Sequence, residues 1–234
     1  MIKLIKNEFI KNGKYKLLFS LFFFFIIILI IKEYSDNFKS TMYSLIPFIG
    51  VLGCVYFSGI ISNEIENGTF RFYLTKPVSR NNIYISKYFS IIIFLLIICL
   101  FIFLVYMFYC EFSVDDFILY FKYLCPLLLI SSLIMFLSVI FKNTSVVVGI
   151  SVFLLVFSTL LSQVLFGIGF TYIEYTFLPY MDFSIFNDVE SLSLMNSELG
   201  INLSISSGLY INIIYSVLLF LLGLFIFAKK DIKN

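Results

Sequence analysis

The chain has 234 residues, of which 61% are hydrophobic and only 13% are charged. Soluble domains are about 45–50% apolar and about 25% charged, so a fold in water could not cover this much apolar surface. We therefore expect lipid to be the solvent for most of the chain. The formal net charge is only +2 and histidine is absent, which argues against nucleic-acid binding and against a Cys/His metal site.

Six segments approach the length of about 20 mostly apolar residues that a membrane-spanning helix needs. They are Tyr15–Ile31, Met42–Ser62, Tyr88–Cys110, Phe117–Phe141, Ser145–Ile168 and Gly208–Ala228. The first run ends at Lys32 and Glu33 with no small-residue cleavage pattern, so we interpret it as a retained span and not as a signal peptide. The sequence thus predicts an all-α membrane protein with six transmembrane helices, forming a single domain over residues 1–234.

The orientation follows from the distribution of lysine and arginine, which favour the cytoplasmic side. Most cations fall on one side of the predicted spans: Lys3, Lys6, Lys11, Lys14, Lys16, Arg71, Lys76, Arg80, Lys87, Lys142, Lys229, Lys230 and Lys233. Most acids fall on the other: Glu33, Asp36, Glu111, Asp115, Asp116, Glu174, Asp182, Asp188, Glu190 and Glu198. We expect a multi-pass membrane protein with both termini in the cytoplasm. The bias toward Ile, Phe, Asn and Lys is typical of an AT-rich genome and fits the bacterial cytoplasmic (plasma) membrane.

Two further segments flank the spans. Residues 1–14 place Ile2, Ile5 and Phe9 on one helical side, which predicts a short interfacial helix; the alternative is a frayed basic start that serves only topology. Residues 169–207 are acidic and aromatic. They predict short external helices before the last span, with an ordinary external loop as the alternative.

The longest polar interruption on the basic side is the segment 63–87, which reads NEIENGTFRFYLTKPVSRNNIYISK from Asn63. A loop that only joined two helices could be much shorter. Its order is two acids, Gly-Thr, a short amphipathic stretch, Pro-x-Ser-Arg, and a lysine before the next span. The matching residues are Glu64, Glu66, Gly68, Thr69, Phe70, Arg71, Tyr73, Leu74, Pro77, Arg80 and Lys87.

This segment resembles the first cytoplasmic loop of ABC-2 type permeases, the membrane subunits of ATP-binding-cassette exporters. The resemblance in residues covers about 25 positions, and the order of spans and terminal segments extends it over the whole chain. It implies a cytoplasmic coupling helix near Asn67–Thr75 that docks on ABC ATPase subunits through Phe70, Tyr73 and Leu74, with Arg71 at the rim. The alternative is a membrane-surface loop whose cations set topology.

The resemblance also implies a second permease copy or a sister permease, forming a homodimer or heterodimer. Serines Ser151, Ser158 and Ser162 mark one face of the fifth predicted span. Small and polar residues promote helix contact in membranes, so we interpret these serines as packing residues and as candidates for a pathway or dimer contact. Gly50, Gly53 and Gly59 are close-approach positions in the second span.

The sequence offers no acid–base constellation and no GxxxxGK[ST] phosphate loop. We therefore expect no catalytic, cofactor or metal site in this chain, which is then not itself an enzyme. The resemblance implies that ATP and magnesium bind to the partner ATPase.

The function that the resemblance implies is outward movement of a hydrophobic or amphipathic substrate by a permease subunit of an ABC exporter. Its substrate is expected to be a peptide, such as an antimicrobial peptide, or a drug. The alternative is a non-transporting membrane scaffold or immunity protein that sequesters a membrane-active peptide. An ion-coupled carrier would need ionisable residues in the middle of the spans, and none of the acids falls there.

Overall fold

A computed structural model describes residues 2–34, 45–68, 79–109, 114–168, 175–181, 193, 196–197 and 203–229. In this part of the chain the regular elements are all helical. They are α1 (Ile2–Tyr34), α3 (Ile46–Phe57), α4 (Gly59–Glu66), α6 (Arg80–Tyr109), α7 (Val114–Ile140), α8 (Thr144–Val156), α9 (Ser158–Gly167), the 3-10 helix η2 (Pro179–Met181) and α11 (Ile205–Lys229).

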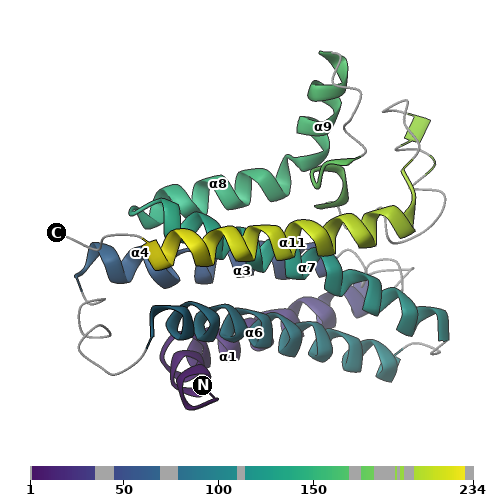
Figure 1. Cartoon of the computed structure of the whole chain (residues 1–234). Helices are drawn as coiled ribbons and strands as arrows, with labels where there is room; N and C mark the ends of the chain where they lie inside the picture. The colour runs from purple at the N-terminus through teal and green to yellow at the C-terminus, as the bar shows by residue number, and fades with distance from the viewer. Residues whose placement is uncertain are drawn as a thin grey trace.

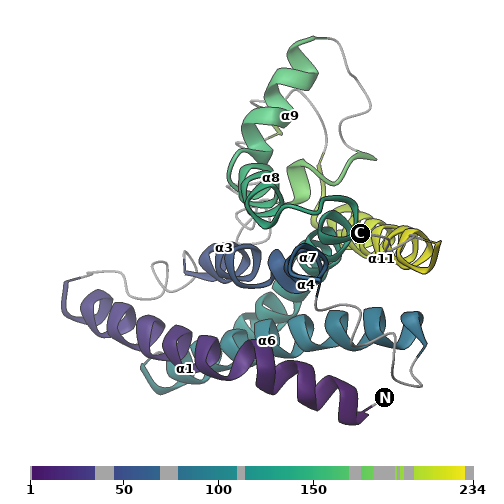
Figure 2. The same ribbon diagram turned by 90° about the vertical axis from the view of Figure 1, so that its left-hand side faces the viewer.

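The helices stack in layers (Figures 1 and 2). α1 and α6 form one layer, α3, α4, α7 and α11 form the next, and α8 covers that layer on its far side. The most extensive contacts join α7 to α11 and α1 to α6. The start of α1, the end of α4, the start of α6 and the end of α11 all lie at one end of the bundle, which we call the α4–α6 end (Figure 1).

Five stretches of the described residues are long and apolar enough to cross a membrane. They are Tyr15–Glu33, Pro47–Glu66, Arg80–Tyr109, Tyr120–Ile140 and Ile205–Lys229. The expectation of an all-α, membrane-embedded protein is therefore confirmed at this level, with five such helices in the described part of the chain where the sequence predicted six.

The difference lies in the fifth predicted span, Ser145–Ile168, which is not one helix. α8 ends after 13 residues, and Phe157 leaves helical geometry at φ −102° and ψ 14°. α9 then departs in a different direction (Figure 1). The hydroxyl of Ser158 donates to the carbonyl of Leu155 at 3.2 Å, and such local serine bonds compete with the backbone ladder of a helix.

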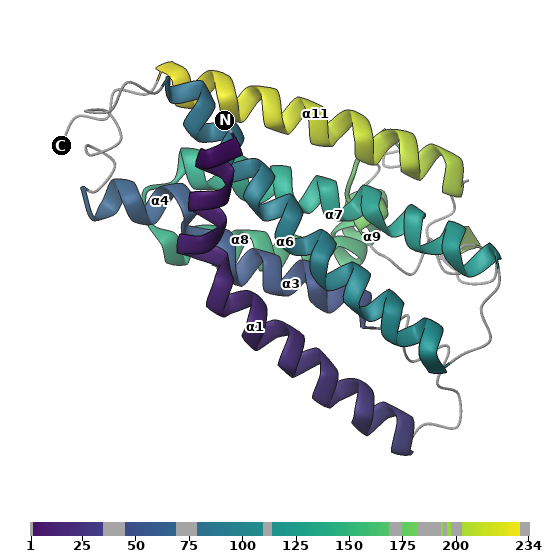
Figure 3. The ribbon, with the colours of Figure 1, turned by 90° about the horizontal axis from the view of Figure 1, so that it is seen from below.

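The N-terminal segment continues into the first span. Residues 1–14 were predicted to form a short interfacial helix; from Ile2 onward they are helical and belong to α1, which runs to Tyr34, and their place at a membrane surface stays a prediction. Figure 3 shows that α1 changes direction between its N-terminal part and its apolar part. The first span and the segment before it are therefore one element.

α6 begins at Arg80, well before the predicted start at Tyr88. The backbone N–H of Asn82 donates to the hydroxyl of Ser79 at 3.3 Å, so Ser79 caps the helix N-terminus. One consequence is that Lys87, expected to be a loop residue, lies inside α6.

The second predicted span, Met42–Ser62, is formed by α3 and α4, which meet at Ser58 and extend to Glu66. Its glycines do allow close approach. A Cβ at Gly50 would lie 2.9 Å from Ile130, and one at Gly53 would lie 3.0 Å from Leu95. The interpretation of these two positions as packing sites is confirmed.

Most of the 169–207 segment lies outside the described residues. Among the residues of this segment that are described, η2 is buried and contacts α7, α9 and α11. Asn212 donates to the carbonyl of Tyr180 at 3.1 Å, and the Tyr180 and Ser207 hydroxyls lie 2.9 Å apart. This portion is therefore held against the bundle by polar contacts to α11.

α6 and α11 meet around a buried aromatic cluster near the α4–α6 end. The ring of Tyr84 lies 5.5 Å from that of Phe220 and 5.6 Å from that of Phe227. Tyr84 also faces Gly223, where an added Cβ would overlap its hydroxyl and lie 3.5 Å from the backbone of Phe136. The absence of a side chain at Gly223 thus makes room for the tyrosine.

We expect Gly223→Ala to destabilise the fold by about 1–3 kcal/mol, because overpacking displaces a buried side chain. The measurement is the midpoint of thermal unfolding in detergent. Gly149→Ala is the matched control, since nothing lies within 4 Å of its added Cβ. Equal midpoints for the two variants would contradict the close packing of Tyr84 on α11.

Candidate functional site

The most unusual group in the described chain is the ammonium of Lys87. This lysine belongs to α6, and its side chain is fully buried. Its Nζ lies 3.1 Å from Oε2 of Glu8 on α1 and 2.9 Å from Oε2 of Glu64 on α4. It also donates to the carbonyl of Ile60 at 3.1 Å. We call Glu8, Ile60, Glu64 and Lys87 the Lys87 cluster.

The Lys87 cluster satisfies the needs of a buried cation. An ammonium has three protons, and three oxygens surround this one. Glu8 and Glu64 are themselves 4% and 7% exposed, so little water reaches the pair. Moving such charges out of water costs several kcal/mol per ion, and close partners must offset that cost. The two ion pairs of Lys87 therefore hold α1, α4 and α6 together at this position.

The cluster lies at a junction of the chain. Glu64 sits in the last turn of α4 and Lys87 in the second turn of α6. These two helices flank residues 67–79, the middle of the 63–87 segment that carries the resemblance. Glu64 was predicted to be one of the two acids at the start of the coupling segment; the structure places it in α4 and pairs it with Lys87.

Other predicted coupling residues serve the ends of the flanking helices. Glu66 is exposed and accepts a hydrogen bond from the Thr144 hydroxyl at 3.3 Å. Gly68 has a φ of +66°, and its N–H donates to the carbonyl of Ile65. Glycine is favoured in this left-handed conformation just beyond a helix C-terminus. Arg80 is the first residue of α6.

The remaining coupling residues lie outside the described residues: Thr69, Phe70, Arg71, Tyr73, Leu74 and Pro77. The coupling helix expected near Asn67–Thr75 is thus described only at Asn67, which caps α4, and at Gly68.

The three serines proposed for a pathway or dimer contact are all buried within the chain. Each hydroxyl donates to a carbonyl of its own helix region: Ser151 to Val147, Ser158 to Leu155 and Ser162 to Ser158. Ser151 also faces the thiol of Cys54 on α3. Because of the break at Phe157, they are divided between α8 and α9 and do not share one straight helix.

A polar pocket of about 190 Å³ lies beside the Lys87 cluster. It is lined by Lys16 of α1, by the α3–α4 junction, and by Thr144 at the start of α8. Lys16 Nζ donates to the carbonyl of Tyr56 at 2.6 Å. The pocket therefore presents a cation together with neutral polar groups.

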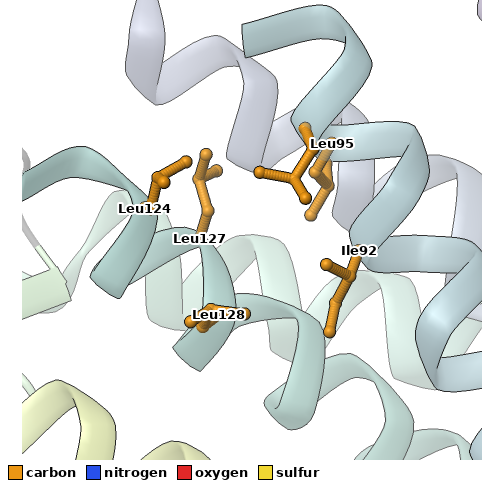
Figure 4. A pocket seen from close by; sticks show the side chains of 6 residues that line it. Ile92, Leu95, Leu124, Leu127 and Leu128 are labelled. Carbon is orange, nitrogen blue, oxygen red and sulfur yellow. The ribbon is translucent and has the colours of Figure 1, made fainter. Parts of the chain in front are cut away.

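A second kind of hollow lies between α6 and α7 (Figure 4). Ile92 and Leu95 face Leu124, Leu127 and Leu128 across a space of about 170 Å³. An adjoining space of about 180 Å³ continues the hollow toward Phe103 and Phe117. Because its lining is almost wholly apolar, this groove suits hydrocarbon.

The sequence reasoning missed the Lys87 cluster. Lys87 was counted among the cations of the cytoplasmic side and Glu64 among the acids of the 63–87 segment, and neither was placed beside Glu8. One signal was present: Glu8 is the only acid among the first fourteen residues, in a segment otherwise rich in lysine. A single acid within a basic segment is consistent with an ion pair to one particular cation, here Lys87.

Comparisons with known proteins give a family and one curated relative. The family model described as "Protein of unknown function (DUF2705)" matches residues 31–233. The uncharacterized protein YhcI of Bacillus subtilis (strain 168) is 24% identical over 211 residues, which cover 79% of this chain. The chain spans about 65% of the length of that relative.

We expect Lys87→Met to destabilise the fold by about 3–5 kcal/mol, because it leaves two buried carboxylates without their cation. The measurement is again thermal unfolding in detergent. Adding Glu8→Gln and Glu64→Gln should recover much of the loss, since it removes the uncompensated charges. Lys142→Met, at an exposed position, is the control. A triple variant no more stable than Lys87→Met would contradict the electrostatic explanation.

The two acids of the motif should behave differently when neutralised alone. Glu64→Gln removes a buried partner of Lys87 and should lower the unfolding midpoint, whereas Glu66→Gln alters an exposed hydrogen bond and should change stability by less than about 0.5 kcal/mol. Equal effects in a side-by-side unfolding experiment would show that burial does not separate their roles.

Proposed function

We propose that this chain, which belongs to the DUF2705 family of proteins of unknown function, is the membrane permease subunit of an ATP-driven exporter. In this proposal a separate ATPase of the ATP-binding-cassette class hydrolyses ATP. The chain itself conducts a hydrophobic or amphipathic substrate outward, with a peptide or drug as the expected cargo.

The observation that carries the proposal is the Lys87 cluster. The segment 67–79, whose residues resemble an ABC-2 coupling loop, connects α4 to α6. The ion pair between Glu64 and Lys87 joins these two helices close to where the segment begins and ends. Glu8 adds α1 to the same joint.

Such a joint suits the transmission of force. A partner that moves the 67–79 segment would otherwise move that segment alone. With both flanking helices tied together by buried charges, the movement passes to α4 and α6 as one unit. Because Glu8 of α1 also pairs with the Lys87 ammonium, α1 would move together with α4 and α6. Rigid elements joined by a dense polar contact carry displacement better than an exposed loop does.

The nature of the chain supports the choice of cargo. The groove between α6 and α7 is lined by aliphatic and aromatic side chains, which favours apolar groups. The basic residues near the α4–α6 end support a cytoplasmic location for that end and for both termini in the bacterial plasma membrane. A second copy or a sister permease would complete a pathway at an interface.

The test is purification of the tagged chain from its host membranes in mild detergent, followed by mass spectrometry of whatever accompanies it. We expect an ATP-binding-cassette ATPase in stoichiometric amount. The double variant Phe70→Ala/Tyr73→Ala should lose it, since buried aromatic anchors dominate interface energy at about 2 kcal/mol or more each.

The matched control is Phe108→Ala/Tyr175→Ala, which removes an exposed phenylalanine and tyrosine outside the 67–79 segment. It should keep the ATPase. A clean preparation without ATPase would overturn the proposal and favour the scaffold that sequesters a membrane-active peptide. Loss of the ATPase in both double variants would remove the role assigned to Phe70 and Tyr73.

A further inference from the structure

We propose that the pocket between α1, the α3–α4 junction and the start of α8 binds the phosphate of an anionic phospholipid headgroup. The pocket has a volume of about 190 Å³ and contains Lys16, Gly59, Asn63 and Thr144 in its lining. This inference does not depend on the proposed transport function. It concerns a lipid bound at a defined place and not the bilayer in general.

The first step is the state of Lys16. Its side chain lies near the Tyr56 and Phe57 rings, with Nζ 5.6 Å from each centroid. Nζ donates one hydrogen bond, to the carbonyl of Tyr56. Among the described residues its contacts are all with uncharged groups. A cation held against apolar rings is stabilised by an anion, and two of its three N–H groups remain to bind one.

The second step is the rest of the lining. Asn63 accepts from Asn67 through Oδ1, so its own amide N–H groups can donate. α8 begins at Thr144, and the side chain of its N-cap Asn143 accepts a hydrogen bond from the Ser145 N–H. A helix start carries partial positive charge and favours phosphate. Glu66, the acid that binds the Thr144 hydroxyl, is exposed, so it faces water.

The third step is the position of the pocket along the bundle. Lys16 lies at the start of the apolar stretch Tyr15–Glu33, and Asn63 lies near the end of the stretch Pro47–Glu66. These limits are where headgroups meet hydrocarbon, and lysine is drawn there to anionic lipid. The pocket is thus at the depth of a lipid phosphate.

The fourth step is a place for the acyl chains. Exposed apolar side chains follow Lys16 along α1 at Leu18, Phe19 and Phe22, and Val55 of the pocket lining is itself exposed. Figure 3 shows α1 running away from α3 toward its C-terminal end. A lipid held by its phosphate at Lys16 would lay its chains against these surfaces, which a soluble phosphate compound could not use.

The experiment is native mass spectrometry of the purified chain with phosphatidylglycerol or phosphatidylcholine in matched detergent. Wild-type protein should retain one phosphatidylglycerol at least about tenfold better than phosphatidylcholine, and Lys16→Gln should lose that preference. A tenfold preference corresponds to about 1.4 kcal/mol, and we expect it because the choline cation of phosphatidylcholine opposes the attraction of its phosphate to Lys16. Glutamine was chosen because it can still donate to the Tyr56 carbonyl, so the charge is what changes.

Two controls separate the site from general effects. Lys16→Arg keeps the charge and should keep the lipid. Lys32→Gln removes another lysine of α1, whose Nζ lies 4.2 Å from the Tyr109 ring centroid, and should also keep it. Retention by Lys16→Gln equal to wild type would overturn the proposal.

Two comparisons use the wild-type chain alone and do not depend on a variant that folds. Equal retention of phosphatidylglycerol and phosphatidylcholine would overturn the proposal that the site prefers an anionic headgroup. Displacement of phosphatidylglycerol by millimolar inorganic phosphate would overturn the lipid as the source of the phosphate. If phosphatidylglycerol stays bound in the presence of inorganic phosphate, the proposal that the ligand is a lipid is supported, because the acyl chains then contribute to binding.

Discussion

A single buried cation constrains the arrangement of this bundle. Lys87 cannot sit among apolar helices without oxygen partners, and it takes them from α1 and α4 as well as from a backbone carbonyl. Packing between apolar helices in lipid specifies position weakly, since lipid tails are as apolar as leucine. The ion pairs add direction and distance to that packing. They determine where the N-terminal part of α1 lies relative to the α4–α6 end.

Sequence patterns predicted the helical class and the apolar stretches well, because hydropathy over about 20 residues is a strong signal. They also predicted the close approach at Gly50 and Gly53. The break at Phe157 was missed because Ser145–Ile168 contains no charged residue and no proline, and hydropathy does not register a change in helix direction. Pattern reasoning likewise placed the start of α6 too late, because it treated the polar turns after Ser79 as loop.

The candidate site was harder to predict than the fold. Which carboxylate meets Lys87 depends on tertiary contacts between residues 8, 64 and 87, and spacing along the chain says nothing about them. The motif residues had local explanations that the structure supplied: Ser79 caps α6, and Gly68 ends α4 in a left-handed conformation. The end residues of a segment that resembles a functional motif can therefore cap the neighbouring helices. The middle residues are then the ones available to bind a partner.

The break between α8 and α9 has a consequence for the surrounding bilayer. At about 1.5 Å per residue the 13 residues of α8 extend about 20 Å, whereas the 30 residues of α6 extend about 45 Å. A hydrocarbon layer of about 30 Å matches neither. Since α6 and α8 lie in different layers, the two faces of the protein present different hydrophobic thicknesses. Such mismatch favours lateral association that covers the short face, and it sorts proteins between membranes of different thickness.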